Sequence, residues 1–338
     1  MFNIPGETVA IIGPKGIPKE FPGTSGVEFY VERKSLELTN KGKTVRCYIR
    51  RWASTNNAKS YQGIDRVIIP SINTVFFDTI SYSLLASIHA SFGNATTVWY
   101  QGIGPAFFSF IPKLFHKKIY TTIHSLDWKR KKWGLFAQFF LRLCEIATIR
   151  FSDKVFVVSK KLQIYYTDTY HVHPILDKYK NPKSPSVPFD QARRKYSLTK
   201  NKYILYLGRF VPEKRIEWLI HACSDIKGLT VVLAGGSSHS DKYVSYLKSL
   251  GKEINIRYTG YVFGREKAEL LSNCKLFVLP SMLEGYPVAV TEALGYGKKC
   301  LVGDFLKSEY PTENKTIHYF NTYSYDNFLL KLKRLIKE

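Results

Sequence analysis

Residues 276–297, LFVLPSMLEGYPVAVTEALGYG, place two carboxylates eight positions apart around an expected strand, turn and helix. The apolar run from Leu276 to Leu279 is typical of a buried strand, which a proline and a serine then end. Pro287 suits the first turn of a helix, because its missing N–H would be unpaired there anyway. The pattern therefore predicts Glu284 in a loop and Glu292 inside a helix.

The expected start of this helix is a candidate anion site. Gly285 lets the backbone approach a ligand with no side chain in the way. Unpaired amides near this start, between Gly285 and Ala289, favour a negatively charged group such as a diphosphate. Tyr286, Pro287 and Val288 are therefore candidate donor-binding positions. Taken alone, the stretch fits equally well a surface loop followed by an amphipathic helix, with both glutamates solvated.

A second stretch favours the anion site. The strand-like run from Tyr203 to Leu207 is followed at once by GRFVPEK, residues 208–214. Cations placed just past the C-terminal end of a strand, at the mouth of an α/β sheet, are suited to holding anionic oxygens. Arg209 and Lys214 are therefore candidate phosphate ligands.

These two stretches together resemble the signature of the retaining nucleotide-sugar glycosyltransferases of family four, which have the GT-B fold. That signature is E-x7-E preceded by a G-R-x5-K-like element, and here it reads Glu284-x7-Glu292 after Gly208-Arg209…Lys214. The resemblance implies an α/β protein of two Rossmann-like domains, with parallel sheets that face each other across a cleft.

Two N-terminal segments, residues 11–33 and 120–150, resemble a narrower subgroup that contains bacterial rhamnosyltransferases and related surface-polysaccharide enzymes. The resemblance thus covers nearly the whole chain. It implies transfer of a hexosyl or deoxyhexosyl unit from a nucleoside-diphosphate sugar to a hydroxyl of a glycan or lipid-linked acceptor.

Composition agrees with two domains and an anionic partner. The 338 residues are 45% hydrophobic, which is enough for two cores. Lys and Arg number 50 and Asp and Glu 27, so the net charge is +23. That sign favours a membrane surface, a nucleotide sugar or nucleic acid, without choosing among them.

The compartment that we expect is the cytoplasm. Five cysteines without a C-x-x-C pair indicate neither a disulfide framework nor a zinc knuckle. No basic-apolar-small signal peptide opens the chain, and no stretch reaches the roughly 20 uncharged apolar residues of a spanning helix. Any membrane association is therefore expected to be peripheral, at the inner face.

A long glycine-rich loop follows the first expected strand, Thr8 to Ile12, and precedes a helical pattern at about 27–41. The loop has neither the spacing of a dinucleotide fingerprint nor the ending of a P-loop. In the resembled family the equivalent loop lies against the donor sugar and the acceptor. The resemblance therefore implies Gly16 at the donor and Gly26 on the acceptor side.

The run KIYTTIHSLDW, residues 118–128, is an expected strand that ends near His124 and Asp127. A lone histidine after a strand is more often structural than functional. The resemblance shifts that judgement, because members of the family place a histidine here beside the donor sugar, with Asp127 then on the acceptor side.

A basic cluster surrounds this loop and leads into an expected helix at 133–149, whose apolar residues recur at helical spacing. We rank first a core helix with a solvated basic start. The alternative is a basic and aromatic rim that rests on anionic lipid headgroups. The basic residues are Lys113, Lys117, Lys118, Lys129, Arg130, Lys131 and Lys132, and the apolar ones are Leu135, Phe136, Phe139, Phe140, Leu143, Ile146 and Ile149.

Strands and helices alternate along the rest of the chain, which predicts parallel sheets covered on both faces. We expect an acceptor-side domain at 1–172, a proline-rich linker at 173–190, a nucleotide-sugar domain at 191–320, and a terminal helix within 321–338. In proteins of the resembled fold such a helix often crosses back to the first domain, and its position here permits that. Other expected strands lie at 44–49, 66–69, 97–100, 154–158, 229–234, 255–259 and 299–302, and other helices at 74–92, 213–227, 241–251, 265–273 and 324–337.

The loops after the strands of the second domain should meet at one edge, where Val262 would contact the donor. By resemblance, Glu284 contacts sugar hydroxyls, Glu292 the ribose, and His124 lies near the reacting sugar. Arg209 and Lys214 would meet the charge of the leaving diphosphate. No D-x-D motif suits a divalent ion, so we expect no metal and no cofactor.

Other chemistries fit parts of the pattern. Two carboxylates acting as acid and nucleophile are the weaker mechanism, because in the family the leaving phosphate itself takes the acceptor proton. A sugar-nucleotide epimerase or a phosphorylase of the same fold is the nearest alternative function. A nucleic-acid-binding protein would fit the charge, but no recognised binding module is present, so no nucleic acid partner is expected.

Overall fold

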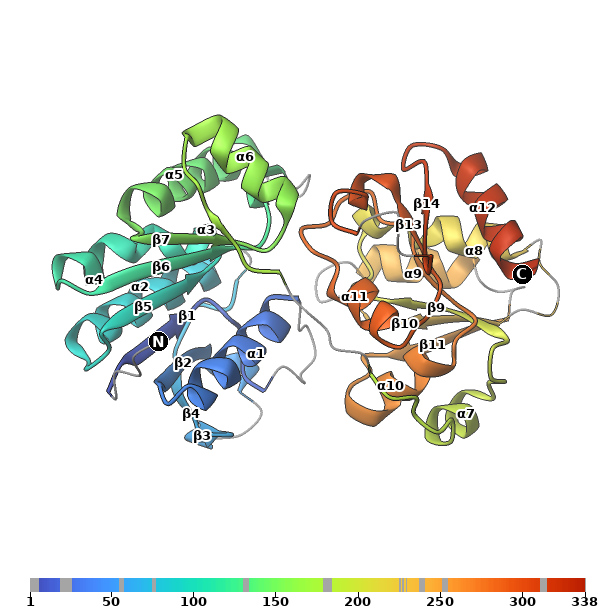
Figure 1. Cartoon of the computed structure of the whole chain (residues 1–338), viewed down its shortest axis with the longest axis horizontal. Coiled ribbons are helices and arrows are strands. Elements are labelled where there is room, and N and C mark those ends of the chain that lie inside the picture. The colour runs from blue at the N-terminus through green and yellow to red at the C-terminus, as the bar shows by residue number, and fades with distance from the viewer. Residues whose placement is uncertain are drawn as a thin grey trace. The chain divides into compact units, whose positions relative to one another are not determined.

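The computed structural model describes residues 6–18, 26–54, 58–74, 77–129, 134–178, 184–224, 226, 228, 230–236, 241–250, 255–310 and 315–337. The chain divides into two compact units, Met1–Lys178 and Tyr179–Glu338 (Figure 1). Each unit has its own sheet with helices packed against it.

The first unit is built on an eight-stranded sheet in the order β3-β4-β2-β1-β5-β6-β7-β8. All its pairings are parallel except that of β3 with β4. Its strands are β1 (Thr8–Ile12), β2 (Thr44–Arg50), β3 (Ser60–Tyr61), β4 (Ile64–Ile69), β5 (Thr97–Gln101), β6 (Lys118–Ile123), β7 (Lys154–Val157) and β8 (Ile175–Leu176).

The helices of the first unit connect these parallel strands, and Figure 1 shows α1 at one end of the unit and α5 and α6 at the other. They are α1 (Gly26–Asn40), α2 (Phe77–Phe92), α3 (Ile103–Ala106), α4 (Phe110–Leu114), α5 (Leu135–Phe151) and α6 (Lys160–Tyr170). Short 3-10 turns are η1 (Arg51–Ala53), η2 (Phe107–Ser109) and η3 (Asp127–Lys129). Sequence chemistry explains the start of α6, because Ser159 Oγ accepts a hydrogen bond from the Leu162 amide.

The second unit contains a six-stranded parallel sheet in the order β11-β10-β9-β12-β13-β14. Its strands are β9 (Tyr203–Leu207), β10 (Thr230–Ala234), β11 (Ile256–Gly260), β12 (Leu276–Leu279), β13 (Cys300–Gly303) and β14 (Ile317–Phe320). Most of their side chains are buried, as expected for a parallel sheet covered on both faces.

The helices of the second unit include α12, which packs on β14 and α8. They are α7 (Gln191–Tyr196), α8 (Ile216–Ser224), α9 (Asp241–Leu250), α10 (Gly264–Asn273), α11 (Val288–Gly295) and α12 (Tyr325–Lys337), with 3-10 turns η4 (Pro212–Lys214) and η5 (Asp304–Leu306). The expected strands and helices of both halves thus form where the apolar patterns placed them, within a few residues at each end.

Some elements were not anticipated. The strand β8 lies inside the expected linker at 173–190, where Ile175 and Leu176 pair with β7. A two-residue strand has no periodicity to detect, and the same holds for β3. The strand β14 and the short helix α7 were also missed. Residues 179–183 of the linker lie outside the described part of the chain.

The first-ranked interpretation of the helix at 133–149 as a core helix is wrong. Most of its exposed residues are apolar, and Leu135 and Phe136 are 85% and 84% exposed. Its inward residues include Glu145 and Thr148. Periodicity indicated one apolar stripe, but did not indicate which way the stripe faces. The basic residues Arg130, Lys131 and Lys132, with Trp133, lie outside the described residues, as do residues 19–25 of the glycine-rich loop.

Candidate active site

The strand order of the second unit defines a topological switch point. The chain runs from the central strand β9 outward through β10 to β11, and then returns to β12 on the other side of β9. In open parallel sheets ligands bind outside the carboxyl ends of the strands at such a point. The loops that follow β9 and β12 carry GRFVPEK (208–214) and the E-x7-E stretch respectively.

Backbone hydrogen bonds join the loops that follow β9, β10 and β11. The Phe210 amide donates to the Gly236 carbonyl (2.9 Å), and the Gly235 amide donates to the Gly260 carbonyl (2.8 Å). Gly235 has φ +136°, and a Cβ there would lie 1.9 Å from the Gly208 carbonyl oxygen. Only glycine fits this approach, so the position of Gly208 depends on Gly235.

Lys214 and Glu284 form an ion pair between η4 and the loop after β12. Their side chains are only 12% and 11% exposed. Burial lowers the pKa of Lys214 from its usual value, the Glu284 carboxylate opposes that shift, and the nearby Arg209 guanidinium adds to it. The structure therefore brings these three predicted residues close together.

Glu292, inside α11, forms a second ion pair with Lys267 of α10, at 2.6 Å. These side chains are also 11% and 12% exposed. Lys267 was not anticipated from the sequence. It lies 25 positions before its partner, and a lysine in the first turn of a helix is ordinarily a solvated residue.

The start of α11 is held by tyrosines. Pro287 is the residue before the helix and Val288 its first residue. The Tyr310 hydroxyl donates to the Pro287 carbonyl (3.2 Å), and the Tyr286 ring stacks on the Tyr310 ring at 5.9 Å between centroids. Gly285 lies directly before Tyr286 in the loop that follows β12. Val262, which follows β11, is buried. The expected donor-binding residues of this unit therefore belong to ordered backbone.

The first unit has its own switch point, between β1 and β5. Gly13 follows β1 with φ +132°, and a Cβ there would lie 2.7 Å from the Gln101 carbonyl oxygen. Arg50 Nη1 donates to the carbonyls of Gly13 (3.1 Å) and Pro14 (2.9 Å). These contacts fix the start of the glycine-rich loop. Gly16, two residues after Pro14, is buried.

His124 lies just after β6, with its Nε2 3.1 Å from Gln101 Oε1 and its ring edge-on to Tyr30 at 5.0 Å. Burial lowers the pKa of His124 to about 4, against the opposing effect of Asp127. The imidazole is therefore neutral at pH 7. Gln101 was missed because an amide at the end of a strand carries no motif.

The two acceptor-side candidates are each the first residue of their element. Asp127 begins η3 and accepts a hydrogen bond from Ser125 Oγ at 2.9 Å. Gly26 is the first residue of α1 and is exposed. These positions do not test the acceptor-side roles of Asp127 and Gly26, which stay predictions.

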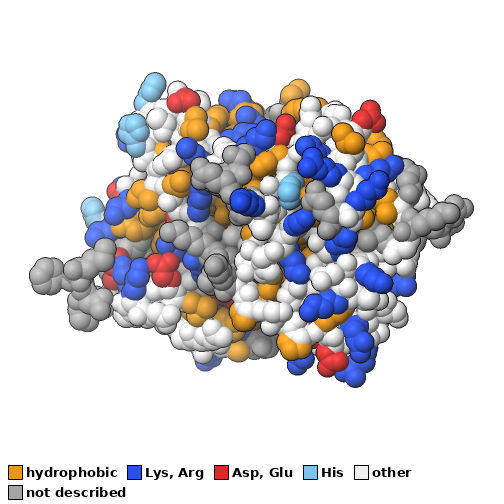
Figure 2. Space-filling model, turned by 45° about the vertical axis from the view of Figure 1, so that its right-hand side comes forward, with side chains coloured by type: hydrophobic (Ala, Val, Ile, Leu, Met, Phe, Trp, Pro, Cys, Tyr) orange, Lys and Arg blue, Asp and Glu red, His pale blue; other side chains and the backbone are white. Residues whose placement is uncertain are grey.

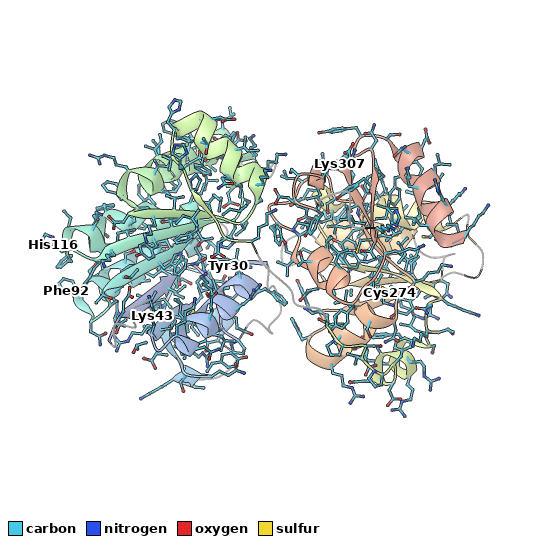
Figure 3. The ribbon with its side chains drawn as sticks, viewed as in Figure 1. Tyr30, Lys43, Phe92, His116, Cys274 and Lys307 are labelled. Atoms are coloured by element: carbon cyan, nitrogen blue, oxygen red, sulfur yellow. The ribbon has the colours of Figure 1, made fainter. Side chains whose placement is uncertain are left out.

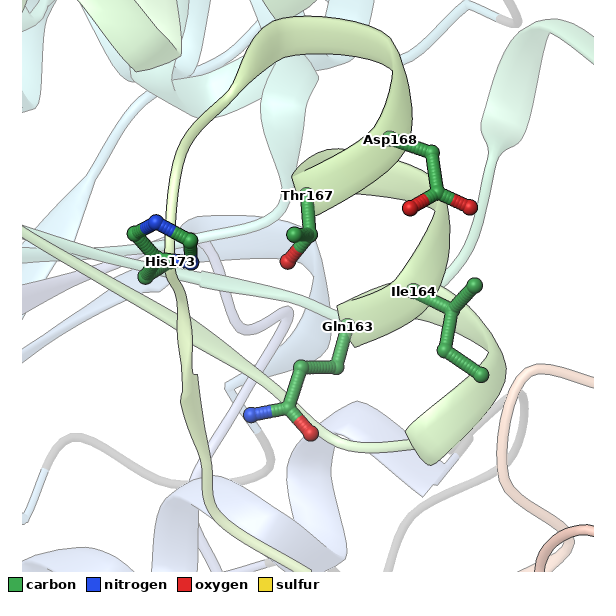
Figure 4. Close-up of a pocket in the computed structure, with 5 residues that line it drawn as sticks. All are labelled: Gln163, Ile164, Thr167, Asp168 and His173. Atoms are coloured by element: carbon green, nitrogen blue, oxygen red, sulfur yellow. The ribbon is translucent and has the colours of Figure 1, made fainter.

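A pocket of about 320 Å³ lies along α6 and the segment that follows it (Figure 4). It is lined by Gln163, Ile164, Thr167, Asp168 and His173, none of which is a predicted site residue. The Gln163 amide is already occupied by the Pro174 carbonyl at 3.0 Å. We assign no role to this pocket.

Known proteins match both halves of the chain. Residues 6–179 match the family described as "Domain of unknown function (DUF1972)", and residues 188–338 match "Glycosyl transferases group 1". The O-antigen chain mannosyltransferase B of Escherichia coli is 32% identical over 124 residues, which cover 34% of this chain and 32% of that protein. The chain thus matches about a third of the length of this relative.

Solved structures share the fold. Sucrose-phosphate synthase from Thermosynechococcus elongatus superposes with a TM-score of 0.83 at 17% identity, over 98% of this chain and 90% of that one. The Anabaena protein HepE, solved with UDP and glucose, gives 0.71 at 15% identity, over 88% and 81%. The two parallel-sheet α/β units therefore have the GT-B fold that the resemblance implied. The chain belongs to the DUF1972 family, and its second half matches the glycosyl transferases group 1.

Proposed function

We propose that this protein is a retaining glycosyltransferase. It would move a hexosyl or deoxyhexosyl unit from a nucleoside-diphosphate sugar to a hydroxyl of a glycan or lipid-linked acceptor, in the assembly of a cell-surface polysaccharide. The observation that carries the proposal is the gathering of Arg209, Lys214 and Glu284 at the switch point of a group 1 domain. The O-antigen relative and the UDP complex of HepE support the substrate class.

The diphosphate of the donor would replace the Glu284 carboxylate as the partner of Lys214. In the structure Glu284 pairs with that lysine, so the buried Lys214 ammonium is not left unpaired. When the glycosidic bond breaks, negative charge grows on the leaving diphosphate, and the cations Arg209 and Lys214 would stabilise it without a metal or other cofactor. Glu284 would then be available to accept hydrogen bonds from the sugar hydroxyls.

The remaining roles follow the family resemblance. Glu292 would bind the ribose, with Lys267 holding its carboxylate in place. Gly208, Val262 and the segment Gly285 to Val288 would approach the donor through their backbone.

In the first unit, neutral His124 and the loop at Gly16 would lie near the reacting sugar, with Gly26 and Asp127 toward the acceptor. The leaving phosphate would take the acceptor proton, which gives retention.

The proposed enzyme works in the cytoplasm, at the inner face of a membrane if its acceptor is lipid-linked. No helix in the described part of the chain is long and apolar enough to cross a bilayer. Attachment would therefore be peripheral, and the rhamnosyltransferase-like subgroup would be the nearest in substrate.

Calorimetric titration with a panel of UDP-, GDP- and dTDP-sugars tests the donor class. The Lys214→Ala variant should then lower kcat with the best donor by about 100- to 1,000-fold, because one preorganised charge contact is typically worth about 2.7–4 kcal/mol in the transition state. The matched control is Lys195→Ala, which breaks an exposed ion pair with Glu266 in the same unit.

Near-wild-type turnover of Lys214→Ala at saturating donor would contradict the assignment. Product analysis separates the alternative functions: a transferase yields sugar on an acceptor, a phosphorylase yields sugar phosphate, and an epimerase converts the donor without transfer. Retention by DNA at low salt, with no affinity for any nucleotide sugar, would instead favour nucleic-acid binding.

A further inference from the structure

The outward face of α5 is apolar. The exposed positions Leu135, Phe136, Phe139, Leu143 and Ile146 recur at intervals of three and four residues, so they lie on one side of the helix. A surface helix of a globular protein ordinarily turns such a stripe toward the core and its polar side to water. In α5 this arrangement is reversed.

The inward face of α5 is held by polar contacts. The buried Glu145 carboxylate accepts hydrogen bonds from the hydroxyls of Tyr166 (2.6 Å) and Tyr170 (2.9 Å) on α6. The Thr148 hydroxyl donates to the Cys144 carbonyl (2.8 Å) within the helix. Rotating the apolar stripe inward would separate Glu145 from these tyrosines and leave the buried Tyr166 hydroxyl without its partner, at a high cost. The outward direction of the stripe is therefore built into the fold.

The same reversal occurs in α2. Apart from Tyr82, its buried residues are alanines and serines, and Ser87 shares a hydrogen bond with the Tyr100 hydroxyl at 2.7 Å. Its outward side carries Leu85, Ile88 and Phe92, all exposed. Two separate helices of one unit thus bury polar side chains and expose large apolar ones.

The helix α4 joins these two surfaces, because it packs against both α2 and α5. The Phe92 and Phe115 rings meet edge-on at 4.8 Å, and those of Phe110 and Phe151 lie 6.0 Å apart. Figure 3 shows Phe92 and the neighbouring His116 at the same outer edge of the first unit.

We call this surface the α2–α4–α5 face. Six of its apolar side chains are more than half exposed, namely Phe92, Leu114, Leu135, Phe136, Phe139 and Ile146. Contiguous apolar surface of this kind marks an interaction site in a water-soluble domain.

Basic residues lie on α5 and at the start of β6, the strand that follows α4 in the chain. Lys118 and Arg150 are exposed, and the Arg142 guanidinium stacks over the Trp128 ring at 3.9 Å. Of the acids on the described residues of these helices and just after α5, Asp78 of α2 is paired with Arg50, Glu145 is buried, and Asp153 is paired with Lys113. Lys and Arg also dominate the charged side chains on the view of Figure 2. A second copy of the chain would bring like charges together, whereas an anionic lipid surface would complement them.

We propose that the α2–α4–α5 face is a membrane-docking surface, in which Phe136, Phe139 and their apolar neighbours enter the headgroup region of an anionic bilayer while the basic residues contact lipid phosphates. This inference rests on the peripheral attachment proposed above and identifies its surface. Attachment depends on apolar insertion as well as charge, as for helices that lie in the plane of the interface.

Co-sedimentation of the full chain with vesicles of phosphatidylethanolamine and phosphatidylglycerol tests the docking surface. The double variant Phe136→Ser/Phe139→Ser should weaken partitioning by about a hundredfold or more. A tenfold change corresponds to about 1.4 kcal/mol, and two buried phenylalanines exceed twice that value. The matched control is Tyr323→Ser/Leu330→Ser, which removes two large apolar side chains that are 85% and 66% exposed in the second unit.

A charge variant adds a second arm. Lys118→Glu/Arg150→Glu should weaken binding to the anionic vesicles, and its effect should shrink in high salt. The parent protein should bind vesicles of pure phosphatidylcholine far less well. Thermal melting and donor titration verify that each variant is folded and keeps its nucleotide site, so loss of vesicle binding is separated from failure of the proposed enzyme function.

Equal vesicle binding by the parent and the Phe136→Ser/Phe139→Ser variant would overturn the proposal, as would absence of binding by the parent. Sedimentation velocity provides one further decisive outcome. If the parent self-associates and the same variant abolishes that association without affecting vesicle binding, the α2–α4–α5 face is an interface between copies of the chain.

Discussion

The helices α5 and α12 have similar patterns in the sequence and opposite orientations in the structure. In α12 the apolar residues Phe328, Leu332 and Leu335 are buried against its own unit, and basic residues such as Arg334 face water. In α5 the apolar residues face water and Glu145 is buried. A helical period predicts that a stripe exists, but its direction depends on what the neighbouring elements offer.

The neighbours explain the difference. Against α12, the second unit presents apolar rings, including Trp218 and Phe320, which lie 5.9 and 5.0 Å from the Phe328 ring. Against α5, the first unit presents the hydroxyls of Tyr166 and Tyr170. The apolar side chains of α12 therefore contribute to the core of the second unit, whereas those of the α5 stripe are left exposed on the first.

The largest expected effect concerns the buried ion pairs of the second unit. Lys267→Met should destabilise the protein by about 3–5 kcal/mol, because it leaves Glu292 buried without its counter-ion. Urea unfolding measures this loss. The double variant Lys267→Met/Glu292→Met should recover most of it, since replacing both charges removes the unpaired carboxylate. A single variant as stable as the parent would show that solvent satisfies Glu292.

The next effect compares the two stripes directly. Leu332→Ala in α12 should cost about 2–5 kcal/mol, because it opens a cavity in the core. Leu135→Ala in α5 should change the free energy of unfolding by no more than about 0.5 kcal/mol, since that side chain is exposed. Equilibrium unfolding without lipid measures both, and similar losses would mean that α5 is covered in solution.

The smallest effect is a pH dependence in the first unit. The pKa of His124 falls from 6.5 to about 4 on burial, so the unfolded chain takes up a proton before the folded chain does. Above pH 6.5 His124 is neutral in both states and burying it has no protonation cost. As the pH falls from 6.5 toward 4, the free energy of unfolding decreases by roughly 1–3 kcal/mol, because only the unfolded chain takes up the proton. His124→Gln should flatten the stability curve across this window.

Urea unfolding at pH values between about 4 and 7 measures that curve. His221→Gln, at an exposed position of α8, is the matched control and should keep the wild-type slope. A His124→Gln protein whose stability still falls as steeply as the parent's would show that other groups carry the dependence.

Local sequence signals determined the elements and the positions of most candidate residues. Apolar runs of four or five residues predicted β1, β9 and β12, and the residues that end them predicted Glu284 in a loop and Glu292 in a helix. These features depend on neighbours in the chain, which any reader of the sequence can see. The two-residue strand β8 carried too little pattern to be found.

Only the tertiary structure decided which residues meet and which way the stripes face. The pairing of Lys267 with Glu292 and the contact of Gln101 with His124 each join positions more than twenty residues apart, and neither Lys267 nor Gln101 belongs to a motif. The sequence determined that α5 has an apolar side. Its outward direction follows from the hydrogen bonds that tyrosines of α6 offer to Glu145, because an unpaired buried carboxylate costs more than an exposed phenylalanine.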